Sequence, residues 1–272
     1  MKERIQKSLA NAGVDSRRNV EQLVLDGRIS VNKRIVTRLP VLIDPERDRV
    51  EVDGELIRLA ERRGARRVYL LMNKPKGVVT TNVAQGVQTR ALDLLPPGLP
   101  DRVYPVGRLD SQTKGVLLLT NDGELTHRLT HPKFGVPRTY RATVDGEIGQ
   151  SVISQLEKGV WLAAVPGGKA KKTGRSQVKV VKRTEEKSII EIVMREGVNP
   201  EIRRMLAKLG HKVRDLTRVK LGSLTLEGLP VGKVRLLTSK ELNELKRMAQ
   251  RGEDGAEKRE GGKRPPAPSP GV

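Results

Sequence analysis

The chain has 272 residues, and its 53 lysines and arginines outnumber its 32 aspartates and glutamates, giving a formal net charge of +21 at pH 7. Such an excess favours a polyanionic partner, nucleic acid before an acidic membrane surface, over a surface that is basic but merely solvated. The absence of cysteine excludes disulfides and thiol nucleophiles, the three histidines have no carboxylate cluster around them and predict no metal site, and no apolar stretch reaches the roughly 18 residues that span a bilayer.

We therefore expect a cytoplasmic protein that makes no membrane contact. The chain has one phenylalanine, one tryptophan and three tyrosines. With so few rings, contact with a nucleic acid is expected to depend on charge and shape rather than on bases stacked in succession on aromatic side chains.

The first 60 residues predict a small helix-hairpin unit. Apolar residues recur at helical spacing up to Gly13 and again up to Gly27, which predicts two short helices that each end at a glycine. Beyond Gly27 the apolar residues alternate, and turns at Asn32-Lys33 and Asp53-Gly54 predict small hairpins. Basic residues gather around the second helix and the first turn, where they either contact phosphates or form a solvated polar face: Arg17, Arg18, Arg28, Lys33 and Arg34.

Residues 61–67 predict a charged linker, and residues 68–249 predict a larger domain. Strand-like runs are interspersed with helical patterns in this domain, which predicts an α+β fold with a mixed or antiparallel sheet and flanking helices. The expected strands are 68–75, 115–120, 138–144, 176–182 and 189–194, and the expected helices are 124–129, 150–157 and 200–209. The basic loop 166–175 is either a phosphate contact or a solvated connection. A capping box at 238–241 begins a last helix, and residues 250–272 predict a disordered basic tail.

The helix at 200–209 has strong local signals. Asn199 can cap it, Pro200 suits its first position, and an apolar stripe follows up to Gly210, which can end it. Arg203 and Arg204 then project from its first turn.

One carboxylate, Asp110, lies in a Gly-Arg-Leu-Asp turn directly ahead of the apolar run at 115–120. An aspartate in a loop is usually a turn or cap residue, because its side chain bonds to nearby backbone amides. Taken alone, Asp110 is therefore best explained as structural, and only the other motifs of the chain change that interpretation.

Four motifs in the order LMNKPKGVVTT at 71–81, GRLDSQTKGVLLLTNDGEL at 107–125, PRTYRATVDG at 137–146 and REGVNPEIRRMLAKLG at 195–210 resemble the RsuA/RluB branch of the pseudouridine synthases. The N-terminal unit resembles the S-four-type RNA-binding module of that branch, so the resemblance covers roughly residues 3–247. The segment VWLAAV at 160–165, the basic loop after it and the charged tail resemble the large-subunit-modifying RluB group more than the small-subunit RsuA group.

The resemblance implies an enzyme that isomerises a specific uridine of ribosomal RNA to pseudouridine without a cofactor. It implies Asp110 as the essential carboxylate, acting on the ribose either as a nucleophile or as a base. It also implies Arg203 as the ion-pair partner of Asp110, and Tyr140 as the aromatic ring that packs against the flipped base. The implied partner is ribosomal RNA or a ribosome assembly intermediate, bound by a monomer.

Three further basic residues are expected at the RNA surface by the same resemblance. Arg108 would fill the space that the flipped base leaves or hold a neighbouring phosphate, unless it forms a structural ion pair. Lys74 and Lys76 would line the entrance to the site.

The chain departs from the family pattern at Asn199-Pro200-Glu201, where a basic residue commonly stands in the middle position. This puts one RNA contact in doubt and leaves Arg203 in place. Two other classes stay open: a non-catalytic RNA-binding or ribosome-assembly protein on the same scaffold, and a hydrolase, which would need a second carboxylate such as Asp122 or Glu124.

Overall fold

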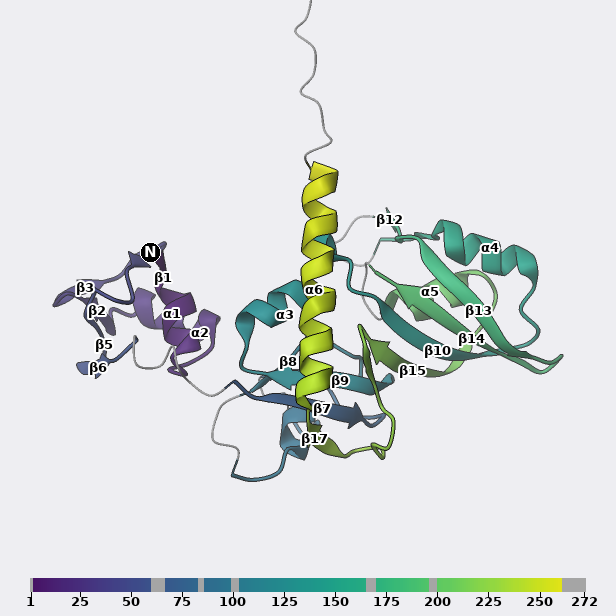
Figure 1. The fold of residues 1–272 in the computed structure, drawn as a ribbon, viewed down its shortest axis with the longest axis horizontal. Coiled ribbons are helices and arrows are strands. Elements are labelled where there is room, and N and C mark those ends of the chain that lie inside the picture. The colour runs from purple at the N-terminus through teal and green to yellow at the C-terminus, as the bar shows by residue number, and fades with distance from the viewer. Residues whose placement is uncertain are drawn as a thin grey trace, which may run out of the picture. The chain divides into compact units, whose positions relative to one another are not determined.

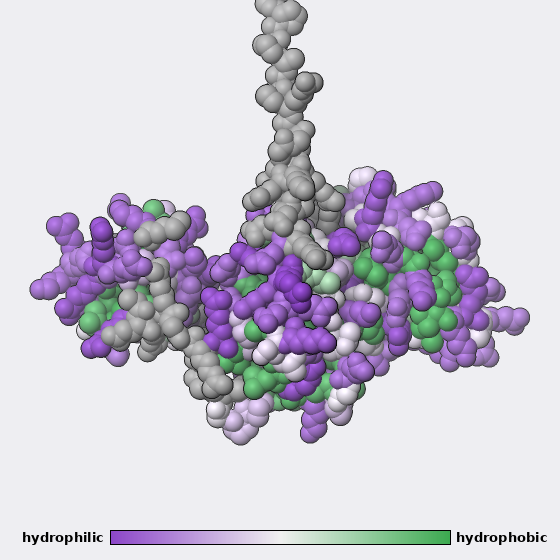
Figure 2. Space-filling view, in the orientation of Figure 1, coloured by the Kyte–Doolittle hydropathy of each residue, from purple (hydrophilic) through white to green (hydrophobic). Residues whose placement is uncertain are grey.

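The computed structural model describes residues 2–59, 67–82, 86–98, 103–164, 170–195 and 200–260. The chain forms two compact units, Met1–Val68 with Gly98–Val103, and Tyr69–Pro97 with Tyr104–Val272. The predicted linker lies outside the described residues as far as residue 66, and so do Asn199, residues 165–169 of the basic loop and the tail from 261 onwards. Hydrophilic residues dominate the face of both units that is seen in Figure 2.

The smaller unit packs two helices against a four-stranded sheet (Figure 1). The helices are α1 (Ile5–Asn11) and α2 (Arg17–Leu25), and Ser16 caps α2 by accepting a hydrogen bond from the Asn19 amide. The sheet has the order β3-β2-β5-β6 and consists of β2 (Ile29–Val31), β3 (Arg34–Val36), β5 (Val50–Val52) and β6 (Glu55–Ile57), while β1 (Glu3–Arg4) pairs separately with β4 (Leu42–Ile43). Its core includes Ile5, Leu9, Val20, Val24, Ile29 and Val50.

The first hairpin turn of this unit is the predicted Asn32-Lys33 pair. Both residues have positive φ, 52° and 67°, as a two-residue hairpin turn of the commonest type requires. Lys33 occupies a position where glycine is usual, so this turn holds a lysine in the left-handed region.

The larger unit is built on a nine-stranded sheet with the order β13-β14-β10-β15-β9-β7-β17 (Figure 1). Every pairing recorded in it is antiparallel except the parallel pair of β15 with β9, so the predicted mixed α+β fold is confirmed. The strands are β7 (Tyr69–Lys74), β9 (Lys114–Thr120), β10 (Arg138–Asp145), β13 (Ser176–Arg183), β14 (Lys187–Met194), β15 (Val213–Leu221) and β17 (Val234–Leu236), with β8 (Tyr104–Pro105) and β16 (Leu224–Thr225) beside β9 and β15.

The helices of this unit are α3 (Gly123–Thr130), α4 (Gln150–Lys158), α5 (Pro200–Lys208) and α6 (Ser239–Glu260), with short helices η2 (Ala91–Leu94) and η3 (Pro132–Phe134). Figure 1 shows α4 lying alongside β13. A separate two-stranded ribbon pairs β11 (Trp161–Leu162) with β12 (Lys171–Lys172). None of the helices in the described parts of the chain is long and apolar enough to cross a membrane.

The last helix begins as predicted and ends later than predicted. Thr238 and Glu241 form the capping box, because each side chain accepts a hydrogen bond from the other residue's backbone amide, at 2.9 and 3.2 Å. Leu245 and Ala249 are buried in the core that α6 shares with α3 and η3. The helix continues to Glu260, whereas the sequence predicts disorder from residue 250. Alanine, glutamate, lysine and arginine in this stretch favour helix strongly enough to carry it past Gly252 and Gly255.

Candidate active site

Asp110 lies in the loop between β8 and β9, and backbone hydrogen bonds fix this loop on both sides of it. The Thr80 hydroxyl donates to the carbonyl of Leu109 at 2.8 Å and accepts from its amide at 3.3 Å. On the other side, the Gly77 amide donates to the Ser111 carbonyl at 2.7 Å. The Asp110 side chain is half-buried, and within the described residues no hydrogen bond to its carboxylate is recorded. These bonds fix the backbone of the loop on both sides of Asp110 and leave its carboxylate without a recorded hydrogen-bond partner in the described parts of the chain.

A row of directly opposed residues crosses four neighbouring strands behind this loop. Lys74 on β7 pairs with Gly115 on β9, Gly115 pairs with Arg218 on β15, and Arg218 pairs with Tyr140 on β10. Opposed residues share one face of a sheet, so Lys74, Arg218 and Tyr140 lie on the same face. The row gathers two cations and an aromatic ring from segments that are far apart in the sequence.

Lys74 is fully buried, which corrects the prediction that it lines the entrance with Lys76. Its ammonium group donates to the carbonyls of Pro75 at 2.9 Å and Val78 at 2.5 Å. Burial lowers the pKa of Lys74 from 10.5 to about 8, an effect that the nearby Asp110 carboxylate opposes and the Arg218 charge reinforces. Lys74 therefore holds the segment 75–78 from the protein interior, and the Gly77 amide of that segment binds the Asp110 loop. Lys76 is exposed, as predicted.

Arg218 is a buried cation that the sequence reasoning missed, together with the strand β15 that carries it. Its side chain is 2% exposed, and its Nε donates to the Val116 carbonyl at 2.7 Å. One terminal nitrogen of the guanidinium has no hydrogen-bond partner among the described residues. An unpaired buried donor beside Tyr140 is a group to which a bound substrate oxygen could bond.

Tyr140 is 4% exposed on β10, next to a bulge at which the pairing of β10 with β15 shifts. Arg138, two residues earlier on the same face, donates to the carbonyls of Leu129 at 2.8 Å and Thr130 at 3.3 Å. Burial lowers the pKa of Arg138, and the neighbouring Tyr140 opposes this change. The Tyr140 ring is therefore held by a strand of the sheet. A ring that packs against a flipped base is expected to be held in this way.

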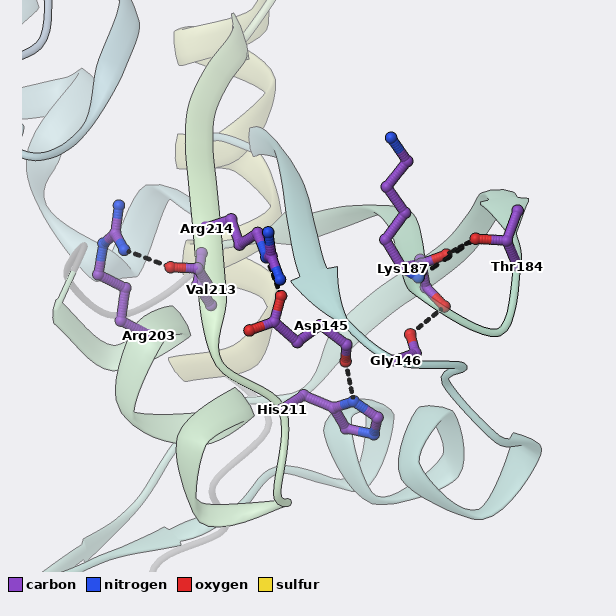
Figure 3. A network of polar contacts seen from close by, with 9 residues as sticks. Asp145, Gly146, Thr184, Lys187, Arg203, His211, Val213 and Arg214 are labelled. Atoms are coloured by element: carbon purple, nitrogen blue, oxygen red, sulfur yellow. Dashed lines mark hydrogen bonds and ion pairs between the residues drawn. The ribbon is translucent and has the colours of Figure 1, made fainter.

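Arg203, on the first turns of α5, reaches the Asp110 loop by a different contact from the one predicted. Its guanidinium donates to the Gln112 carbonyl at 3.0 Å and to the Val213 carbonyl at 3.1 Å. No ion pair with Asp110 is recorded among the described residues, and the buried Nε of Arg203 has no hydrogen-bond partner there. Figure 3 shows Arg203 reaching Val213, with Arg214 and His211 turned toward Asp145 on β10. Arg203 therefore anchors the Asp110 loop through its backbone.

Asp122, the second carboxylate that a hydrolase would need, has a structural role. It is 3% exposed, accepts a hydrogen bond from the Tyr69 hydroxyl at 2.8 Å, and caps α3 by accepting one from the Leu125 amide at 3.0 Å. Glu124 is paired with Arg128 at 2.9 Å. Asp122 is therefore committed to the fold, and Glu124 is an exposed helix residue paired with its neighbour one turn away. Within the described residues there is also no group of three histidines, cysteines or carboxylates that could hold a metal ion.

The predicted RNA-contacting residues of the smaller unit are all exposed, but they are not equivalent. Arg28 forms a bidentate ion pair with Asp53, at 2.8 and 2.6 Å, which raises the pKa of Arg28 and lowers that of Asp53. No such partner is recorded within the described residues for the other four basic side chains, which are Arg17, Arg18, Lys33 and Arg34. Arg108 in the larger unit is exposed as well. Arg28 is thus already neutralised, whereas the others keep free charge.

Comparison with known proteins identifies the family of the chain. Residues 68–208 match the family model described as RNA pseudouridylate synthase, and residues 3–47 match the model of the S4 domain. The chain belongs to the RNA pseudouridine synthase family. The predicted family, the predicted enzyme class and the S-four-type unit are thereby confirmed.

Relatives of this synthase match it over nearly their whole length. Ribosomal large subunit pseudouridine synthase B of Bacillus subtilis is 37% identical over 254 residues, which cover 93% of this chain and 99% of the relative. A protein of Aquifex aeolicus, named as an uncharacterized RNA pseudouridine synthase, is 38% identical over 245 residues, covering 90% of this chain and 94% of the relative. A solved pseudouridylate synthase structure superposes with a TM-score of 0.62 at 26% identity, covering 89% of this chain and 99% of the other.

Proposed function

We propose that this synthase isomerises one uridine of large-subunit ribosomal RNA to pseudouridine, with Asp110 as its essential carboxylate and with no cofactor. The observation that carries the proposal is the Asp110 loop, held by backbone hydrogen bonds and supported from the interior by Lys74. The substrate class is supported by the Bacillus subtilis relative, which is named as a large-subunit enzyme.

The chemistry of the isomerisation fits a site with one carboxylate. Uracil must leave the anomeric carbon of the ribose, turn within the site and be rejoined through its carbon five, so no atom is gained or lost and no electron donor is needed. Asp110 acts on the ribose, and both routes open to it, attack on carbon and removal of a sugar proton, require the ionised form. Asp110 lies close enough to Lys74 for the carboxylate to favour the charged form of that lysine.

The base has to be unpaired before it can enter such a site. Bases of an A-form helix are hidden, so the uridine is flipped out at a cost of a few kcal/mol. In the proposed complex Tyr140 packs against the flipped ring, and the exposed Arg108 fills the gap or holds the adjoining phosphate. Lys76 contacts RNA at the entrance. All of these residues belong to one chain, so we propose a monomer acting in the cytoplasm, where its RNA is assembled into ribosomes.

A pseudouridine map of ribosomal RNA tests this proposal. Cells would carry the native chain, Asp110→Asn, which keeps the size of the side chain and removes its charge, or the control Asp93→Asn, whose carboxylate pairs with Arg90 on the surface. We expect one large-subunit position to lose its pseudouridine with Asp110→Asn alone. Loss of a small-subunit position instead would correct the substrate, and an unchanged map would favour a non-catalytic RNA-binding protein.

The same assay in vitro distinguishes the two physical forms of the substrate. The purified synthase would be given protein-free large-subunit RNA or an assembly intermediate that contains it. A rate that is higher on the intermediate would identify the ribosome precursor as the natural partner, and equal rates would identify the RNA itself.

A further inference from the structure

Trp161 is the only tryptophan in the chain, and the fold turns it toward solvent. It lies on β11, where the alternation of strand side chains places its neighbour Leu162 in the interior, 3% exposed, and leaves Trp161 59% exposed. A tryptophan ring that is so exposed contributes little to the core, and tryptophan is a residue type that is enriched at binding surfaces.

The ribbon that carries Trp161 is fixed to helix α5 at three points. Lys208 donates to the Trp161 carbonyl at 2.6 Å, and Arg204 donates to the carbonyl of Ala163. On β12, Lys171 pairs with Glu201, a carboxylate that is only 4% exposed. The same helix holds the Asp110 loop through Arg203, so the ring of Trp161 and the catalytic loop are positioned by one rigid element.

The surroundings of Trp161 are positively charged. Lys172 is its directly opposed partner across the ribbon and is exposed. Lys158 and Arg175, both exposed, flank the ribbon in the sequence, one before β11 and one after β12. The carboxylate of Glu201 is paired with Lys171, whereas within the described residues no carboxylate partner is recorded for Lys172, the residue opposite the ring.

We propose that Trp161 stacks one unpaired base of the RNA that the synthase acts on, with Lys172 binding the adjoining phosphate. The proposal rests on the proposed function in taking RNA as the ligand. An exposed ring beside cations is the arrangement that proteins use for single-stranded RNA, because every base has a face to stack and a phosphate next to it. One such ring holds one base, in keeping with a chain that is poor in aromatic residues. Bound there, the base sets the position of the strand relative to Asp110.

The fluorescence of Trp161 reports on this site directly, because no other tryptophan contributes to the signal. A single-stranded oligouridylate and a fully paired RNA duplex would each be titrated into the full-length native chain. We expect quenching by the single strand and little change with the duplex, whose bases cannot stack on a protein ring. A change with anionic lipid vesicles and none with RNA would assign the surface to a membrane and overturn the proposal.

Affinity and turnover of variants complete the test. We expect Trp161→Ala to weaken binding of the single strand by about 5- to 150-fold and to raise KM more than it lowers kcat, whereas Trp161→Phe stays close to the native value. Val181→Ala, on an exposed residue of β13, serves as the control. Unchanged binding by Trp161→Ala, with unquenched fluorescence in the native chain, would overturn the proposal. A failure of the proposed function would have a different result: the native chain itself would form no pseudouridine.

Discussion

Lys74 is a buried cation, and its burial has a measurable consequence for stability. Its pKa is about 8 in the folded chain and returns toward 10.5 on unfolding. Between these values the unfolded chain holds a proton that the folded chain has released, so the contribution of Lys74 to stability rises with pH. We expect the free energy of unfolding of the native chain, minus that of Lys74→Met, to rise between pH 8 and pH 10.5. The rise should be at most about 3 kcal/mol, measured by denaturant titration at each pH.

The matched control for this prediction is Lys76→Met. Lys76 is two residues away and exposed, so its ammonium group stays in water in both states of the chain and its difference curve should stay flat. A Lys74→Met curve that is also flat, or that falls with pH, would show that the ammonium group is not buried in solution.

Arg203 binds the Asp110 loop, and in the proposed mechanism this contact gives a second prediction for a single residue. Arg203→Ala removes both hydrogen bonds, to Gln112 and to Val213, and frees the loop to move. Displacing a catalytic group by about 1 Å can cost on the order of a hundredfold in rate, so we expect a loss of that size in kcat. Arg203→Lys should recover only part of it, because lysine lacks the planar fork that bridges two carbonyls.

Steady-state kinetics with a defined RNA check this, and Arg214→Ala is the control. Arg214 lies on the surface of β15 and is paired with Asp145, so its replacement also removes an arginine with a recorded partner but leaves the Asp110 loop untouched. Native kcat in Arg203→Ala would contradict an anchoring role for Arg203.

At the residue scale, the sequence allowed Asp110, Tyr140 and Arg203 to be predicted as a set, because each lies in a motif with a recognisable order. Their catalytic roles stay predictions. Lys74 was misjudged and Arg218 missed for one physical reason: lysine and arginine are almost never fully buried, so a cation in a strand is expected to face water. Only the pairing of four strands brings these two cations to the interior face.

At the scale of elements, Gly115 is the residue at which strand β9 lies against the parallel strand β15. Its φ is 112°, and a Cβ added there would overlap the Arg218 carbonyl oxygen and lie 2.9 Å from the Arg218 nitrogen. We expect Gly115→Ala to separate the parallel pair and to lower the free energy of unfolding by several kcal/mol, since both backbone strain and a backbone overlap oppose it.

Gly146→Ala is the control, because Gly146 also has a positive φ, 72°, but a Cβ there would meet nothing within 4 Å. It should cost only the conformational penalty, about 1–2 kcal/mol. Equal destabilisation by the two variants in denaturant titrations would mean that β9 and β15 do not approach as closely as the register implies.

Elements with strong local signals were predicted well, and elements made by tertiary contacts were not. Helix α5 ends at Lys208, one residue from its predicted end, because the apolar stripe and Gly210 specify it locally. Strand β15 lacks a clean alternation of apolar and polar residues, since Arg218 takes an interior position. The ribbon of β11 and β12 has two residues in each strand and depends on Lys208, Arg204 and Lys171 for its place, which no local pattern encodes.

At the scale of the whole molecule, the net charge of +21 makes RNA binding strongly salt-dependent. Each phosphate contact removed should lower the slope of log affinity against log salt by about 0.7–0.9. The four basic residues of the smaller unit without a recorded carboxylate partner are the ones that we expect to supply such contacts: Arg17, Arg18, Lys33 and Arg34.

Replacing these four residues by glutamine in the full-length chain should therefore reduce the slope by about 2.8–3.6, measured with labelled RNA over a salt series. Arg28→Gln is the internal comparison, because Asp53 already neutralises Arg28 through two hydrogen bonds. Its slope should change less than that of Arg34→Gln, while the thermal stability of the smaller unit should fall because Asp53 loses its partner. If the quadruple variant kept the native slope, the S4 unit would not bind phosphates through this surface, and the positive charge that attracts RNA would have to lie on the larger unit.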